Sequence, residues 1–98
     1  MPYVLKDLVR HAAAHPATFQ IPSRQLRETL AVGSSAKLVF VPSPSVKGGG
    51  HERLWVEITA REGEEYIGRL ERDPMFIDAI GVRKGDTVRF RACHVASI

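Results

Sequence analysis

Residues 53–60 alternate strictly between two kinds of side chain, and this pattern constrains the fold more than any other part of the chain. In an extended strand alternate side chains point to opposite faces, so one face here is apolar and the other is largely polar. The apolar set is Leu54, Val56, Ile58 and Ala60, and the intervening set is Trp55, Glu57 and Thr59. A turn over 61–64 contains Gly63, and residues 65–71 suit a return strand. The pattern therefore predicts an antiparallel hairpin with one buried face.

Two further strands are expected on either side of this hairpin. Residues 36–41 alternate and end in a run that is apolar on both sides. A final strand is expected after Gly85, with Val88, Phe90 and Ala92 opposite Arg89, Arg91 and Cys93. Residues 42–51 contain two prolines and three consecutive glycines, which predict a long, mobile connection rather than a strand. The segment from Asp73 predicts a turn or one helical turn that carries Met75, Phe76, Ile77 and Ile80.

The N-terminal third has a helical pattern. Residues 3–14 place apolar side chains at helical spacing, and Pro16 would end the helix. These apolar residues are Val4, Leu5, Leu8, Val9 and Ala12. Ser23 is the expected N-cap of a short helix over 24–28, with Gly33 as its terminator. The side chains on the inner face of this second helix would be Leu26 and Leu30.

These elements predict one domain over residues 1–98, because a chain of this length supports a single core. Its helical part spans about 3–30, and its β-rich part spans about 35–95. The fold class is α+β, with an N-terminal helix and a short second helix packed on a curved antiparallel sheet of four to five strands. A small, partly open barrel is the expected form of that sheet.

Composition limits the cellular locations and the kinds of partner that are expected for the chain. The only cysteine is Cys93, so an internal disulfide is excluded, and the start of the chain lacks the pattern of a signal peptide. No apolar run is long enough to cross a membrane. The net charge of +3 favours encounters with acidic surfaces only weakly. We expect a cytoplasmic protein that makes no membrane contact.

Several segments in order resemble one bacterial family. They are the stretch from His15 to Ser23, the strand 52–58 (Glu-Arg-Leu-Trp-Val-Glu-Ile), the segment 66–70 (Tyr-Ile-Gly-Arg-Leu), and 85–90 (Gly-Asp-Thr-Val-Arg-Phe). Over nearly its whole length, from about residue 11 to 95, the chain resembles the YegJ-like domain of unknown function (domain of unknown function 2314). The resemblance implies a small bacterial domain, and it carries over no catalytic residues.

The sequence contains no recognisable catalytic constellation. His11 and His15 share one helix face, but no further ligands cluster beside them, so a solvent-facing pair is expected rather than a metal site. Cys93 and His94 would point to opposite faces of a strand, which favours an inert, half-buried cysteine. The glycines at 48–50 follow a lysine and precede a strand, the reverse of a phosphate-binding loop. No catalytic residue, metal or cofactor is expected.

Binding is therefore the leading functional prediction. A protein partner would contact the polar face of the best strand and the loop beside it. The candidate residues are Trp55, Glu57, Arg69, Lys47 and His51, with Glu57 and Arg69 expected to form a cross-strand ion pair. Of the other aromatic residues, Phe40, Phe76 and Phe90 are assigned to the core. The chain is expected to be a monomer or a weak homodimer.

Two alternatives from other classes stay open. Nucleic acid could bind to a basic group near the C-terminus, although exposed aromatics for base stacking are few. That group consists of Arg83, Lys84, Arg89 and Arg91. The third hypothesis is an enzyme whose site has no recognisable sequence pattern.

Overall fold

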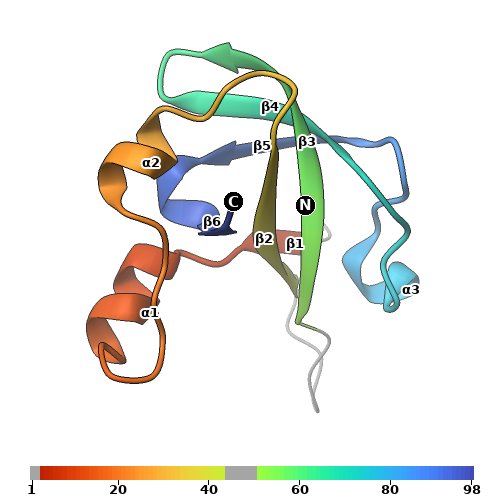
Figure 1. The fold of residues 1–98 in the computed structure, drawn as a ribbon. Helices are drawn as coiled ribbons and strands as arrows, with labels where there is room; N and C mark the ends of the chain where they lie inside the picture. The colour runs from red at the N-terminus through yellow and green to blue at the C-terminus, as the bar shows by residue number, and fades with distance from the viewer. Residues whose placement is uncertain (1–2, 44–50) are drawn as a thin grey trace.

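A single antiparallel sheet curls into a nearly closed barrel at the centre of the computed structural model, which describes residues 3–43 and 51–98 (Figure 1). Within those residues the strands are β1 (Tyr3–Leu5), β2 (Ser35–Pro42), β3 (Glu52–Glu62), β4 (Glu65–Leu70), β5 (Thr87–Arg91) and β6 (Val95–Ser97). The helices are α1 (Leu8–Ala14), α2 (Arg24–Glu28) and α3 (Ile77–Ile80), and the 3-10 turn is η1 (Ala92–His94). The predicted α+β class with a partly open barrel is confirmed.

Strand β2 closes the barrel because two other strands share one of its edges. Along one edge it pairs with β3 from Ser35 to Phe40. On the other edge, Lys37 and Leu38 pair with β6, and the segment from Phe40 to Pro42 pairs with β1. The seam lies between β1 and β5, where residues of both strands line a groove of about 410 Å³.

The core fills the inside of the barrel. The alternation predicted for the hairpin is confirmed, because Leu54, Val56 and Ile58 all point inward. Beyond Ile58 the register shifts, and Ala60 is only half-buried. The remaining buried members of the core are Tyr3, Ala36, Leu38, Phe40, Tyr66, Leu70, Ile80, Val82, Val88, Phe90 and Val95.

The helix predicted over residues 3–14 is wrong in its first part. Tyr3–Leu5 form β1, and α1 begins only at Leu8. The side chain of Asp7 caps this helix, since its Oδ1 accepts hydrogen bonds of 3.1 Å from the amides of Val9 and Arg10. Apolar residues at positions 3 and 5 fit a strand as well as a helix, and the free edge of β2 supplies the hydrogen-bond partners that decide between them.

The short second helix is confirmed, but its predicted inner face is only partly right, because Leu30 packs against the core and Leu26 does not. Ser23 caps α2 as expected, with its Oγ accepting from the amide of Leu26. Leu26 is nevertheless 52 % exposed, and Arg27 points inward instead with 8 % exposure. The guanidinium of Arg27 donates to the carbonyls of Pro22 (2.8 Å) and Ala92 (3.1 Å). Burial of this arginine is possible because backbone oxygens satisfy its donors.

Two other boundaries differ from the prediction. Helix α2 ends at Glu28 with Thr29 as its C-cap. Gly33, with φ of 94°, therefore belongs to the turn that leads into β2 and does not terminate the helix. The last strand does not continue to Cys93, because β5 ends at Arg91 and η1 redirects the chain into β6. In that turn the amide of Arg91 donates to Nδ1 of His94 at 3.0 Å.

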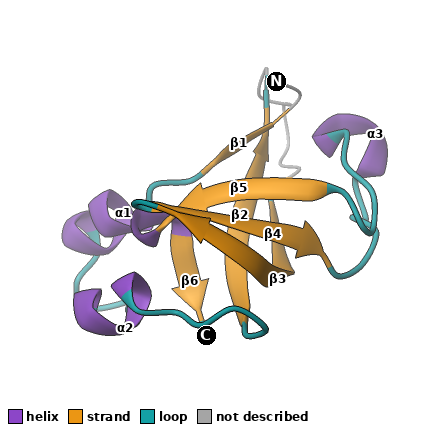
Figure 2. Cartoon of the chain, turned by 90° about the horizontal axis from the view of Figure 1, so that it is seen from above, coloured by secondary structure: helices purple, strands orange, loops and turns teal. Residues whose placement is uncertain are grey.

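The proline- and glycine-rich connection lies mostly outside the described residues, which omit 44–50. Pro42, expected in that connection, is the last residue of β2 and pairs with Tyr3. α1 and α2 lie together on one side of the barrel, and α3 lies on the opposite side (Figures 1 and 2). None of the helices in the described ranges has the length and apolar character that a membrane crossing requires.

Tyr66 ties α2 to the barrel, and its removal should be costly. Its hydroxyl donates to the carbonyl of Arg27 at 2.8 Å and accepts from the amide of Leu30 at 3.2 Å. We expect Tyr66→Phe to lower the free energy of unfolding by about 1–3 kcal/mol, because two backbone groups lose their partner. Urea unfolding followed by circular dichroism measures this. Tyr3→Phe is the matched control, and an equal loss there would contradict the assignment.

Gly68 is required by the close approach of β3. A Cβ at this position would collide with the side chain of Val56 and lie 2.8 Å from the carbonyl oxygen of Glu57. We expect Gly68→Ala to lower the free energy of unfolding by about 1–3 kcal/mol through overpacking. Gly63→Asn is the comparison in the same unfolding experiment. Gly63 has φ of 59° and open space around it, so asparagine there should cost less than Gly68→Ala.

Candidate functional site

The outer face of β2, β3 and β4 carries three of the five residues predicted to bind a partner, namely Trp55, Glu57 and Arg69. Opposite the core, β2 and β3 place polar and aromatic side chains in cross-strand pairs. These pairs are Val39 with Arg53, Lys37 with Trp55, and Ser35 with Glu57. The sequence predicted this face correctly because its residues lie at the alternate positions of the same strand pattern.

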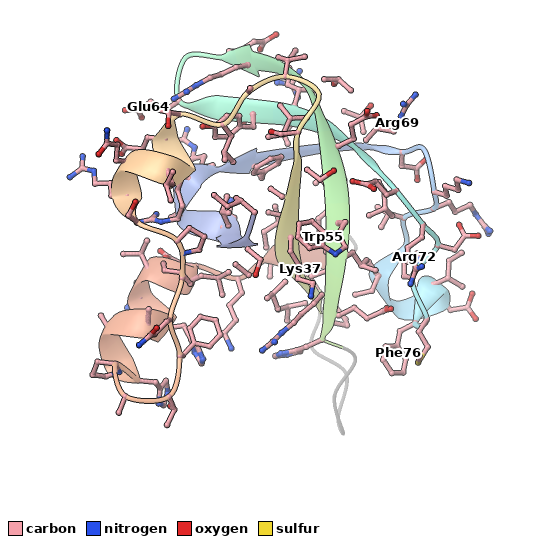
Figure 3. The ribbon with its side chains drawn as sticks, viewed as in Figure 1. Lys37, Trp55, Glu64, Arg69, Arg72 and Phe76 are labelled. Atoms are coloured by element: carbon pink, nitrogen blue, oxygen red, sulfur yellow. The ribbon has the colours of Figure 1, made fainter. Side chains whose placement is uncertain are left out.

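Trp55 lies at the centre of this face and is half-buried (Figure 3). The ammonium nitrogen of Lys37 lies 5.4 Å from the centroid of its ring. Such a cation–π contact contributes about 0.5–1 kcal/mol at an exposed site. Because Trp55 is only half-buried, part of its side chain stays open to solvent beside this contact.

Glu57 and Arg69 form the predicted cross-strand ion pair. They are direct neighbours between β3 and β4, and Nη2 of Arg69 lies 2.7 Å from Oε1 of Glu57. Both side chains are substantially exposed, at 60 % for Arg69 and 38 % for Glu57. An exposed pair contributes little to stability. Its charges therefore remain available to a partner.

The two loop residues of the prediction have different outcomes. Lys47 lies outside the described residues. His51 is exposed, stands directly before β3, and lines a small cavity with Arg53. The predicted His51 therefore lies beside Arg53, next to the start of β3, and not beside Trp55 and Glu57.

The structure reveals one feature of this region that the sequence prediction missed. The chain from Glu71 to Phe76 runs along β3, because the amide of Glu71 donates to the carbonyl of Trp55 and the amides of Met75 and Phe76 donate to the carboxylate of Glu52. Met75 is 82 % exposed and Phe76 is 44 % exposed, so the assignment of Phe76 to the core is wrong. The spacing of apolar residues could not show that Phe76 is exposed, since spacing indicates only which residues could be buried together. The sequence feature that could have indicated this turn is the carboxylate of Glu52, at the start of β3.

The basic group proposed for nucleic acid is spread along β5. Arg83 and Lys84 lie in the turn before this strand, where their amides donate to Asp86 and Asp73. Arg89 and Arg91 lie on the strand itself and face the acidic β3–β4 hairpin. Arg89 lies 2.8 Å from Glu65 and 3.3 Å from Glu62, and Arg91 lies 3.8 Å from Glu64. Three carboxylates therefore oppose two arginines, which weakens attraction for a phosphate backbone.

The histidine pair does not face solvent as a unit. The rings of His11 and His15 are 4.7 Å apart, but His11 is half-buried and packs edge-on against Phe19 at 4.5 Å. Among the described residues, no group of three or more His, Cys, Asp or Glu side chains is arranged to hold a metal ion. His11 instead faces basic neighbours across a cavity.

Cys93 and His94 lie in η1 rather than on a strand. Cys93 is half-buried, and its pKa is raised above the ordinary value, first by burial and then by the negative charge of Asp7. The ring of His94 accepts a hydrogen bond from a backbone amide, and burial lowers its pKa. A thiol with a raised pKa and no free base beside it is a poor nucleophile.

No protein-family model matches the chain, and no curated protein or solved structure shows significant similarity to it. The resemblance to the YegJ-like family thus stays a prediction from the quoted segments. The folded geometry of the chain itself is what bears on its function.

The raised pKa of Cys93 predicts slow alkylation. At pH 7.5 we expect iodoacetamide to modify Cys93 more slowly than it modifies a cysteine in a short peptide, because less of the thiol is ionised. The rate should keep rising above the pH at which the peptide reaches its plateau. Mass spectrometry of timed samples measures both rates. Protein unfolded in urea is the control and should react like the peptide, whereas a folded protein that reacts faster than the peptide would contradict the assignment.

Proposed function

We propose that this chain is a non-enzymatic, protein-binding module. Its contact surface consists of the outer face around Trp55 and the adjoining turn. The residues of this contact surface are Lys37, Trp55, Glu57, Arg69, Arg72, Met75 and Phe76. Figure 3 labels five of them, which are Lys37, Trp55, Arg69, Arg72 and Phe76. The proposal keeps Trp55, Glu57 and Arg69 from the surface predicted from the strand pattern. It leaves out Lys47 and His51 and adds Lys37 and the turn.

The exposure of two large apolar side chains in a constrained turn carries this proposal. Met75 and Phe76 are the apolar pair, and Glu52 binds the backbone amides of both. Large apolar side chains that are exposed next to one another lower the solubility of a protein, and such groups often mark a site where a partner binds. A turn held by hydrogen bonds loses little conformational freedom when it binds, so it suits a partner's pocket.

The neighbouring side chains match the ordinary composition of a protein interface. Aromatic residues, methionine and arginine are enriched in such interfaces, and charged groups concentrate at the rim. Trp55 and Phe76 would serve as the apolar anchors. Lys37, Arg69 and Arg72 would place positive charge around them, which favours a partner with an acidic rim.

Nucleic-acid binding is supported less well, because carboxylates of the β3–β4 hairpin oppose Arg89 and Arg91. No arrangement among the described side chains supports catalysis. That the chain is not an enzyme stays a prediction. Titration with single- and double-stranded DNA and RNA at low salt separates the first of these from protein binding.

A photo-crosslinking experiment tests the contact surface. The photoreactive residue p-benzoylphenylalanine replaces Phe76 in the protein expressed in its own cell, and crosslinked partners are identified by mass spectrometry. With the purified partner, we expect Met75→Ser and Phe76→Ser each to weaken binding by about tenfold or more, as loss of a buried anchor does. Calorimetry measures the dissociation constants.

Val32→Ser is the matched control, because Val32 is 63 % exposed and lies in the turn before β2. It removes an exposed apolar side chain away from the contact surface and should leave affinity within about twofold. Sedimentation velocity of the free protein distinguishes a foreign partner from a second copy of the chain. Equal affinity of the wild type and the Phe76→Ser variant would contradict the proposed surface.

A further inference from the structure

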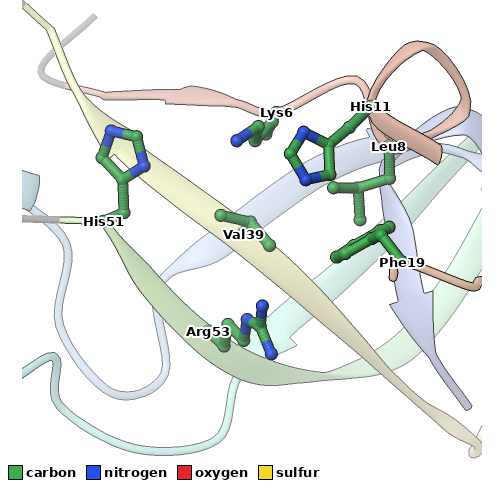
Figure 4. A pocket seen from close by; sticks show the side chains of 7 residues that line it. All are labelled: Lys6, Leu8, His11, Phe19, Val39, His51 and Arg53. Carbon is green, nitrogen blue, oxygen red and sulfur yellow. The ribbon is translucent and has the colours of Figure 1, made fainter. Parts of the chain in front are cut away.

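A small cavity lies between the N-terminal segment and the outer face of β2 and β3 (Figure 4). Its volume is about 120 Å³. The apolar side chains that line it are Leu8, Phe19 and Val39, and the basic side chains are Lys6, His11, His51 and Arg53. Figure 4 shows the basic groups arranged around Val39. They come from the link between β1 and α1, from α1 itself and from the start of β3, which the fold brings together.

The cavity has positive charge without a visible counter-charge. No carboxylate lines it, and within residues 3–43 and 51–98 no ion pair forms with Lys6 or Arg53. Two acids adjoin the lining residues in sequence, and both are engaged elsewhere. The carboxylate of Asp7 caps α1, and that of Glu52 accepts hydrogen bonds from the amides of Met75 and Phe76. Elsewhere on the sheet Arg69, Arg89 and Arg91 have carboxylate partners. Several cations without an ion-pair partner thus lie at one cavity, and their charge favours the binding of an anion there.

The surroundings of His11 agree with this electrostatic picture. Partial burial lowers the pKa of its imidazole, and positive charges lower it further. Those charges belong to Lys6, His15 and Arg53. The groups that face His11 are thus Lys6 from the link after β1, His15 from its own helix, Arg53 and His51 from the start of β3, and the uncharged ring of Phe19. Every ionisable group among them is basic.

The size of the cavity limits the ligand. A cavity that holds one water molecule needs a volume of about 10–15 Å³, whereas drug-sized ligands occupy pockets of roughly 300–1,000 Å³. A cavity of about 120 Å³ therefore admits a small ion with part of its hydration shell and excludes a large organic molecule. The apolar floor of Leu8, Phe19 and Val39 keeps the local dielectric low, which strengthens attraction between the cations and an anion.

We propose that this cavity binds a tetrahedral oxyanion, namely inorganic phosphate or the phosphate group of a small ester. Arg53 would donate through its planar fork, and Lys6 would supply a second positive charge. His11 would add a hydrogen bond once it is protonated. The site is distinct from the contact surface proposed above, although Arg53 is two residues from Trp55 on the same strand face.

This arrangement makes binding depend on pH in a defined direction. In the empty cavity the basic neighbours oppose protonation of His11, so its pKa lies below the ordinary value of 6.5. A bound dianion would offset those charges and raise the pKa again, so binding would take up a proton. Affinity should therefore increase as the pH falls from about 7.5 towards 5.5.

Isothermal titration with sulfate at constant ionic strength tests the site, because sulfate stays a dianion over this pH range. We expect saturable binding to one site, and Arg53→Gln and Lys6→Gln should each weaken it by about tenfold or more through loss of a charge-assisted hydrogen bond. Arg10→Gln is the matched control, since it removes the same charge from an exposed position of α1 that does not line the cavity. It should change affinity by no more than about twofold.

The His11→Gln variant separates the site from general charge attraction. Because His51 still lines the cavity, this variant should keep some pH dependence, but its gain in sulfate affinity between pH 7.5 and 5.5 should be smaller than that of the wild type. It should also take up fewer protons when the titration is repeated in buffers of different ionisation enthalpy. Arg53→Lys serves if Arg53→Gln does not fold, since it keeps the charge but loses the fork and should bind at intermediate strength. Inorganic phosphate and phenyl phosphate, titrated in parallel, distinguish free phosphate from an ester. Unsaturable binding, or equal weakening by Arg10→Gln, would overturn the proposal.

Discussion

The shared edge of β2 is the constraint on which the rest of the structure depends. β6 pairs with Lys37 and Leu38, and β1 pairs from Phe40 onward, so neither strand can extend into the other's place. Between them the carbonyl of Val39 accepts a hydrogen bond of 3.0 Å from the amide of Lys6. The chain must leave the sheet there, and Asp7 begins α1 at once. One backbone strand thus closes the barrel and also sets where the first helix starts.

This geometry places two different surfaces side by side on the outer face of β2 and β3. Because α1 begins beside Val39, it covers the end of the face that carries Arg53 and encloses a basic cavity there. Farther along β3, Trp55 is only half-buried. Its carbonyl accepts a hydrogen bond from the amide of Glu71, where the segment that leads to Phe76 begins. A small domain can in this way offer a charged cavity and an aromatic contact surface from a single pair of strands. The twist of the sheet carries the uncovered part out from under the helix.

Local patterns predicted the hairpin, the inward residues of β3 and the pairing of Glu57 with Arg69, since period-two alternation and a short turn determine all of these. The same patterns misplaced the orientation of α2. Spacing favoured Leu26 as the inner residue, but the carbonyls of Pro22 and Ala92 lie where only a long donor such as Arg27 can reach them. The acceptor at position 92 is supplied by the other end of the chain, so no nearby residue indicates it.

The sequence by itself determined the class of fold, the buried face of the central hairpin and the presence of Trp55 on the opposite face, because these follow from alternation along a strand. Only the tertiary structure decided that Tyr3–Leu5 form a strand, that Phe76 is exposed, and that Lys6 and Arg53 meet at one cavity. Each of these depends on hydrogen bonds or charges between residues far apart in the chain. Such contacts leave no periodic signal, since their partners come together only when β2 closes the barrel.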